Sequence, residues 1–116
     1  MKRVEYSQIV RRKLMMLKVR LTAEFGTKVA TKALKDITNA VRGLETFEEK
    51  GVSVSSMYDI ECDYRYLFVG HNYLFYRIEV DKIIIVEMFD DREDFMYKLF
   101  GITTTSQETL DYWDED

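Results

Sequence analysis

The chain has 116 residues, of which 47% are hydrophobic and 33% charged, with a net charge of −4 and a single cysteine. This length corresponds to one domain of ordinary size, and the hydrophobic content excludes a disordered chain. A single cysteine excludes an internal disulfide, and one cysteine with one histidine excludes a zinc cluster. We therefore expect neither a metal nor a cofactor.

Neither a membrane span nor an export signal is predicted. No apolar run approaches the roughly 20 residues that cross a bilayer. The first residues also lack the apolar stretch and cleavage site of a secretory signal. We expect a cytoplasmic protein without a membrane partner.

The net charge conceals a division between two halves of the chain. Residues 1–50 hold 12 basic and 6 acidic residues, a net of +6, whereas residues 51–116 hold 5 and 15, a net of −10. Such a chain can present a basic helical face to a polyanion or an acidic partner. The alternative is that the two halves simply neutralise one another.

The amino-terminal half predicts a strand followed by a helix. Residues 3–6 read as a short strand, and the hydroxyl of Ser7 is typical of a helix N-cap. Apolar residues then recur at intervals of three and four over residues 10–25, with basic residues on the other faces. This spacing predicts an amphipathic helix.

A second helix is predicted directly after the first. Gly26 ends the first helix, and Thr27 is the expected N-cap of the second. Apolar residues from Ala30 to Leu44 line one side of it. Because the turn is so short, the two helices should form an antiparallel hairpin.

The remaining half predicts a loop and then three antiparallel strands. Residues 52–59 are Ser-rich and unpatterned, which indicates a loop. Two strands, 64–69 and 73–80, flank a turn at residues 70–72, and a β-branched strand follows at 82–89. A short helix is predicted from Asp91 to Phe100.

The predicted order of elements is therefore β-α-α-β-β-β-α. A helical hairpin packed on one face of an antiparallel sheet gives an α+β fold. Residues 1–102 form this domain. Residues 103–116, the acidic tail, contain five acids and no base, and either hang free or dock on a basic groove.

Three segments carry a resemblance to a known family. Residues 64–77, YRYLFVGHNYLFYR, resemble the strand–turn–strand signature YR-apolar-G-NY-apolar-FYR of the RelE/ParE toxin superfamily. Residues 40–51 are similar to its AI-x-x-L-x-x-F-P-x-x-G passage, with Glu48 in place of the proline. Residues 89–96 resemble its LHGRRDW or LYGRRDYM ending, and the match covers about residues 3–101.

The resemblance implies a RelE/ParE-like fold and the toxin of a type II toxin–antitoxin pair, as in plasmid stabilisation systems. Such a toxin is neutralised by a cognate antitoxin in the bacterial cytoplasm. RelE-like members cleave messenger RNA on the ribosome, whereas ParE-like members inhibit DNA gyrase.

RNA cleavage without a metal requires groups that activate the 2′-hydroxyl, neutralise the phosphate and protonate the leaving oxygen. The resemblance places Arg92 where the family keeps an arginine after the last strand, and Tyr97 near a functional Tyr or His. Arg65 is the third catalytic candidate. The structural alternatives are ion pairs with nearby carboxylates: Asp63 or Glu61 for Arg65, and Asp94 or Asp90 for Arg92.

Departures from the family pattern disfavour ribonuclease chemistry. Val69 stands where ribonucleolytic members carry a basic residue. Asp90 and Asp91 replace the His-Gly or Tyr-Gly before Arg92, and Glu93 replaces a second arginine. Each carboxylate beside a phosphate site repels substrate by about 1 kcal/mol or more. The sequence therefore favours a ParE-like toxin.

The basic helical hairpin is the stronger candidate surface, because the resemblance implies that this hairpin reaches gyrase in ParE-like members. Its alternative is a solvated face. Arg77 is added as a target-binding candidate, with a cross-strand ion pair to Glu79 or Glu87 as its alternative. The hairpin residues predicted to bind the target are Lys13, Lys18, Arg20, Lys28, Lys32 and Lys35.

His71 and three tyrosines have both a functional and a structural interpretation. His71, the only histidine, is a candidate general base because imidazole is the side chain suited to proton transfer, but its place in the turn makes it an exposed hairpin residue. Tyr64, Tyr73 and Tyr76 could stack on bases, or could be packing residues of the strands.

An antitoxin should bind at the sheet edge or the helical groove, by strand addition or as a helix in the groove. The alternative function is a non-toxic protein-interaction module on the same scaffold, whose catalytic residues were lost through Asp90, Asp91 and Glu93.

Overall fold

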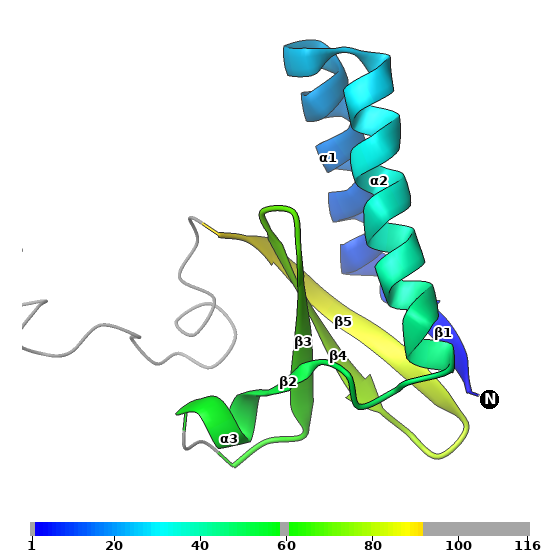
Figure 1. Ribbon diagram of the computed structural model, residues 1–116, viewed down its shortest axis with the longest axis vertical. Helices are drawn as coiled ribbons and strands as arrows, with labels where there is room; N and C mark the ends of the chain where they lie inside the picture. Colours follow the sequence, from blue (N-terminus) through cyan, green and yellow to red (C-terminus); the bar gives the residue numbers. More distant parts are fainter. Residues whose placement is uncertain (1, 59–60, 92–116) are drawn as a thin grey trace, which may run out of the picture.

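The computed structural model describes residues 2–58 and 61–91, which form a five-stranded sheet with a long helical hairpin on one face (Figure 1). The predicted helix that leads to Phe100 and the acidic tail lie outside these residues. The described elements are β1 (Arg3–Tyr6), α1 (Gln8–Phe25), α2 (Thr27–Arg42), the 3-10 turn η1 (Gly43–Glu45), β2 (Val52–Ser53), α3 (Val54–Tyr58), β3 (Tyr64–Val69), β4 (Asn72–Ile78) and β5 (Lys82–Asp90).

Ser7 fixes the start of α1 and ties it to the sheet. Its Oγ accepts a hydrogen bond from the N–H of Val10 at 3.2 Å, which confirms the predicted N-cap. The same hydroxyl donates to the carbonyl of Val86 in β5 at 3.1 Å. The helix therefore leaves the sheet at a defined point.

Gly26 joins the two helices, as predicted, but Thr27 does not cap the second one. Gly26 donates its N–H to Thr22 O at 3.0 Å and accepts at its own oxygen from Ala30 N at 3.2 Å. Its φ of 96° lies in a region that favours glycine. Thr27 is thus the first residue of α2, because one glycine both ends α1 and caps α2.

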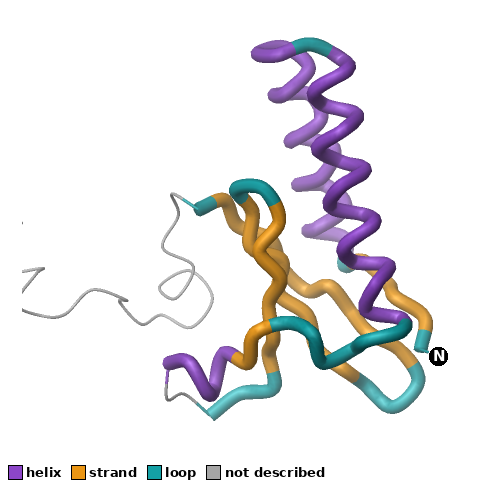
Figure 2. Tube along the Cα trace, in the orientation of Figure 1, coloured by secondary structure: helices purple, strands orange, loops and turns teal. Residues whose placement is uncertain are grey.

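Three strands follow the predicted antiparallel order, but the whole sheet is mixed. The strand order is β1-β5-β4-β3-β2. β1 pairs with β5 in parallel, from Arg3↔Lys82 to Tyr6↔Ile85, so the expectation of an antiparallel sheet was incomplete. The helical hairpin connects β1 to the later strands and lies on one side of the sheet (Figure 2).

The expected loop at 52–59 was wrong over most of its length. β2 pairs antiparallel with β3, Val52 with Tyr66 and Ser53 with Arg65, and α3 follows at once. Val54, the first residue of α3, is fully buried. Burial of Val54 against the sheet outweighs the weak local signal of a Ser-rich segment.

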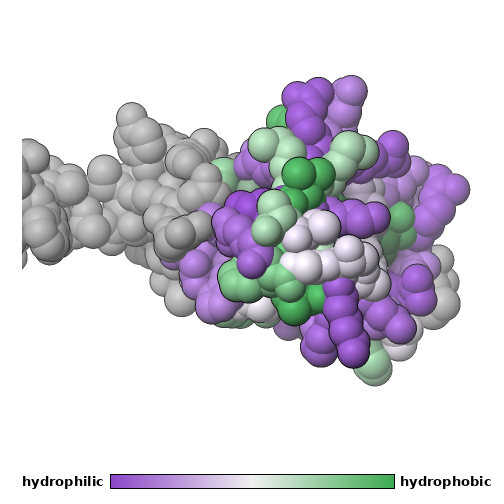
Figure 3. Space-filling view, turned by 90° about the horizontal axis from the view of Figure 1, so that it is seen from above, coloured by the Kyte–Doolittle hydropathy of each residue, from purple (hydrophilic) through white to green (hydrophobic). Residues whose placement is uncertain are grey.

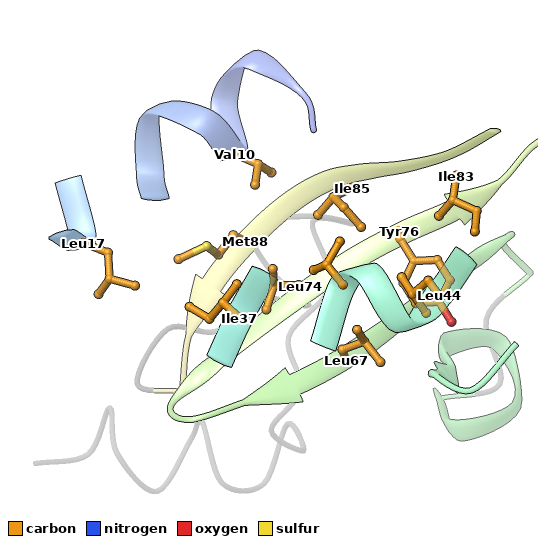
Figure 4. Close-up of a cluster of buried hydrophobic side chains, with 11 residues drawn as sticks. Val10, Leu17, Ile37, Leu44, Leu67, Leu74, Tyr76, Ile83, Ile85 and Met88 are labelled. Atoms are coloured by element: carbon orange, nitrogen blue, oxygen red, sulfur yellow. The ribbon is translucent and has the colours of Figure 1, made fainter. Parts of the chain in front are cut away.

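The main core lies between the hairpin and the sheet (Figure 4). Side chains alternate across a strand, so a smaller cluster occupies the other face, where Val54 meets the aromatic residues of three strands. The main cluster is Val10, Leu17, Ile37, Val41, Leu44, Leu67, Leu74, Tyr76, Ile83, Ile85 and Met88; the smaller one is Val54, Tyr66, Phe75 and Phe89.

The hairpin extends beyond the sheet, and this changes two expectations about its apolar side (Figure 1). Phe25, predicted on the packed face of the first helix, is 61% exposed at the hairpin's end. Leu44 is buried as expected, but it lies in η1, because α2 ends at Arg42. Within the described residues, neither long helix combines the length and apolar composition that a membrane span requires.

Candidate functional site

Arg65, a predicted catalytic residue, holds a loop in place. Its Nη1 donates to the carbonyl of Gly51 at 2.9 Å and to that of Glu49 at 3.2 Å. The sequence predicted an ion pair of Arg65 with Asp63 or Glu61. Among the described residues, the partners of its guanidinium are instead these two backbone oxygens. The guanidinium therefore connects β3 to the segment that precedes β2.

Arg77 forms an ion pair, but not across the strands. Its Nη2 lies 2.9 Å from Oε2 of Glu79, two residues further along the chain. Glu87, the other expected partner, is bound by Lys13 instead. The prediction that Arg77 forms an ion pair is confirmed, but the prediction that this pair crosses between strands was wrong.

Lys13 lies against β5 rather than on the outer face of the hairpin. Its Nζ lies 2.8 Å from Glu87 Oε1 and donates to Met88 O at 2.8 Å. It also lies 4.4 Å from the centroid of the Phe89 ring. β1 pairs with β5 only as far as Ile85, so α1 can reach the edge of β5 beyond that point. Lys13 is therefore a packing residue.

The other five hairpin residues that were predicted to bind the target are exposed, as expected. They are Lys18, Arg20, Lys28, Lys32 and Lys35. Lys32 forms an i,i+4 pair with Asp36 at 2.8 Å, and this hydrogen bond and the charge of Asp36 raise the pKa of the Lys32 ammonium. A basic surface thus covers both helices, and its acidic exceptions are few.

The two remaining catalytic candidates, Arg92 and Tyr97, lie outside the described residues. His71 is in the β3–β4 turn with its side chain 86% exposed, which confirms the structural interpretation. Its Nδ1 lies 2.9 Å from Asp91 Oδ2, and Asp91 N–H donates to His71 O at 2.7 Å. These contacts join the end of β5 to the turn, in which Gly70 has a φ of 62°.

Tyr76 is a buried anchor and not a stacking platform. Its hydroxyl donates to Glu48 O at 2.8 Å and accepts from Gly51 N at 2.9 Å. Burial raises the pKa of the Tyr76 hydroxyl, although the bond from Gly51 and the charge of Arg65 act in the opposite direction. Tyr76 and Arg65 therefore hold the same loop from two sides.

The tyrosines of the opposite sheet face pack against other rings. Tyr73 lies 5.4 Å from Tyr66 in a T-shaped contact and 4.7 Å from Phe68, measured between ring centroids. Tyr64 packs at the margin of the same cluster. The packing interpretation of Tyr64 and Tyr73 is confirmed.

A groove of about 680 Å³ lies between the far half of the hairpin and the β3–β4 turn. Its apolar floor is Leu17, Leu21, Phe25, Val29, Ala33, Ile37 and Val69. Its polar lining is Arg20 and His71 together with the carboxylates of Glu24, Asp36, Asp90 and Asp91. The groove therefore fits an apolar segment that carries basic residues. Among residues 2–58 and 61–91, no three His, Cys, Asp or Glu side chains gather as a metal site.

The sequence indicated a helical groove for an antitoxin but not the residues that line it. The available signal was the pair of apolar residues around Gly26, Phe25 and Val29, whose exposure shows only once the hairpin projects past the sheet. The contribution of Asp90 and Asp91 to its lining depends on a turn that approaches the helices from the other half of the chain.

The fold is shared with a solved structure from a toxin–antitoxin system. A chain of the "Chromosomal ParDE TA system from P. aeruginosa" matches with a TM-score of 0.66 at 18% sequence identity, over 78% of this chain and 96% of that one. No protein-family model matches the sequence, and no curated protein does. The chain has a RelE/ParE-like α+β fold, as the sequence resemblance implied.

Proposed function

We propose that this chain is the toxin of a type II toxin–antitoxin pair in the bacterial cytoplasm, acting on DNA gyrase like ParE rather than cleaving messenger RNA like RelE. The shared fold and the resemblance of residues 3–101 support the general assignment. The choice between the two activities rests on the arrangement of charged side chains.

The observation that carries this choice is the engagement of the sheet's arginines. Arg65 is bound to two loop carbonyls, and Arg77 is paired with Glu79. Metal-free phosphodiester cleavage needs cations and a proton donor turned toward substrate. The hairpin, in contrast, carries exposed cations beyond the sheet, where a large protein target can reach them.

The groove beside the hairpin is the proposed antitoxin site. Strand addition to the part of β5 that extends beyond its pairing with β1 would displace existing bonds, because Val86 O accepts from Ser7 and Met88 O accepts from Lys13. A helix in the groove meets no such obstacle and buries Phe25 and Val29. The acidic lining predicts Lys or Arg at the margin of the antitoxin segment.

Inducing the chain alone in bacteria tests the assignment. We expect growth arrest with intact messenger RNA, and inhibition of gyrase supercoiling by the purified chain. The double variant Lys28→Glu and Lys35→Glu should relieve both effects. The control Arg3→Glu, an exposed reversal in β1, should not.

Two other results would replace this proposal. Arrest with cleaved messenger RNA would identify a RelE-like ribonuclease, with Arg92 and Tyr97 as its catalytic candidates. Normal growth, with soluble protein present, would identify the non-toxic interaction module.

A further inference from the structure

The outer face of α1, defined by Ile9, Met15, Met16 and Val19, is apolar and exposed. These side chains are 50%, 68%, 63% and 66% exposed. At 100° per residue they lie on the side of the helix opposite Leu14, Leu17 and Leu21, which face the core. Within the described residues nothing covers this face.

The outer face is surrounded by positive charge. Arg11, Arg12, Lys18 and Arg20 are exposed along α1, whose single acidic residue is Glu24. Figure 3 looks down on the end of the hairpin, where hydrophobic and hydrophilic residues lie side by side. The fitting occupant is an acidic segment with a few apolar anchors.

The acidic tail of this chain has that composition. It holds five acids and no base, with Leu110, Tyr112 and Trp113 among them. A second copy fits less well, because two α1 helices in contact would bring like charges together. The groove also fits the tail less well, because four carboxylates line it.

The chain passes close to the outer face where its described part ends. A cleft of about 290 Å³ between α1 and β5 is lined by Met16 and Arg20 on one side and by Met88, Phe89 and Asp90 on the other. Eleven residues, 92–102, lie between Asp91 and Thr103 and can span up to about 40 Å. The 18 residues of α1 are only about 27 Å long.

We propose that the acidic tail docks in cis on the outer face of α1. Its acids pair with the cations of α1, and its apolar residues cover the methionines. A tethered segment has an effective concentration in the millimolar range, so a weak contact is sufficient for occupancy. If the proposed function holds, the tail also competes with the target for Lys18 and Arg20, but docking itself does not depend on toxicity.

Trp113, the only tryptophan, reports on this contact in the full chain. We expect Trp113 to be protected from acrylamide quenching at low salt. The quenching constant should rise by about twofold in roughly 1 M salt, where the screening length falls to about 3 Å. The double variant Arg12→Glu and Lys18→Glu should show the higher constant even at low salt. Lys28→Glu with Lys35→Glu, the same charge change on α2, should leave it unchanged.

A second double variant keeps the test valid if the first one does not fold. Met15→Ser with Val19→Ser removes apolar contacts without changing charge, and circular dichroism confirms the helical content of each variant. The proposal is overturned if quenching is equal in all variants and at all salt concentrations. It is also overturned if protection depends on protein concentration, which indicates contact between copies. Protection that occurs only when vesicles of anionic phospholipid are present would indicate a membrane surface and would overturn it as well.

Discussion

The ammonium of Lys13 on α1 lies 2.8 Å from the carboxylate of Glu87 on β5, and it also binds the carbonyl of the next residue. The side chains of this pair are 34% and 19% exposed, so the pair is better shielded than a surface ion pair. A bulge makes this possible. Tyr76 is opposite Ile85 but Phe75 is opposite Glu87, so Val86 has no counterpart on β4.

Replacing Lys13 should destabilise the contact between the hairpin and the sheet. We expect Lys13→Met to lower the free energy of unfolding by about 1–2 kcal/mol, because Met88 O loses its donor and Glu87 its partner. Urea unfolding followed by circular dichroism measures the change. Lys32→Met, which breaks an exposed pair on α2, is the control and should leave the midpoint unchanged. Equal effects in both variants would contradict the role assigned to Lys13.

Gly51 should tolerate no side chain. A Cβ at this position would lie 2.5 Å from Tyr76 Oη and 2.8 Å from the Tyr66 carbonyl. We expect Gly51→Ala to cost about 2 kcal/mol or more in unfolding free energy. Gly43→Ala is the matched control, because its added Cβ meets mainly the flexible end of Lys50. A small effect at Gly51 would mean that the loop yields easily.

Tyr76 should make the free energy of unfolding depend on pH in the alkaline range, above pH 10.0. Burial raises the pKa of its hydroxyl above the ordinary 10.0. The folded state therefore holds this proton more tightly than the unfolded state, so the stabilisation is complete below pH 10.0 and is lost as pH rises through the higher, folded-state pKa. Tyr6, whose pKa is also raised by burial, acts in the same direction.

The variant Tyr76→Phe separates these two contributions. It should lower stability at pH 7 by about 1–3 kcal/mol, because Gly51 N–H and Glu48 O lose their partner. It should also flatten the decline above pH 10.0, leaving the part due to Tyr6. Unfolding midpoints across pH 7–11 measure both effects, and a decline as steep as that of the wild type would exclude Tyr76 as its source.

Arg65 should affect stability more than toxicity. Arg65→Met removes the two bonds to the loop carbonyls and should cost about 1–3 kcal/mol. Growth arrest on induction should persist at permissive temperature, since the proposed function places the target contacts on the hairpin. Loss of arrest with unchanged thermal stability would instead assign Arg65 to catalysis.

Phe25 should matter to the antitoxin and little to the fold. It lines the groove and is 61% exposed, so Phe25→Ser should weaken antitoxin binding by about tenfold or more with little change in stability. Phe47→Ser, at an equally exposed position outside the groove lining, is the control. Titration of the purified chain with its cognate antitoxin measures the effect of both variants. Equal binding by both variants would place the antitoxin elsewhere.

The long elements were predictable because each depends on neighbours close in sequence. The spacing of apolar residues marked α1 and α2, and β-branched and aromatic runs marked β3, β4 and β5. β2 and α3 were missed because two paired residues and one buried valine, Val54, leave no periodic signal. At the candidate site, the exposure of five hairpin cations and a helical groove were foreseen, whereas the residues that line the groove were not.

The sequence alone determined the helical hairpin, its glycine turn and the division of charge, because periodicity, φ preference and composition are properties of neighbouring residues. Only the tertiary structure decided the parallel pairing of β1 with β5, the ion pair of Lys13 with Glu87 on β5 and the hydrogen bonds of Arg65 to two loop carbonyls. Each of these joins residues from separate elements. Which partner a charged side chain takes depends on distances that the fold creates, and no local pattern encodes them.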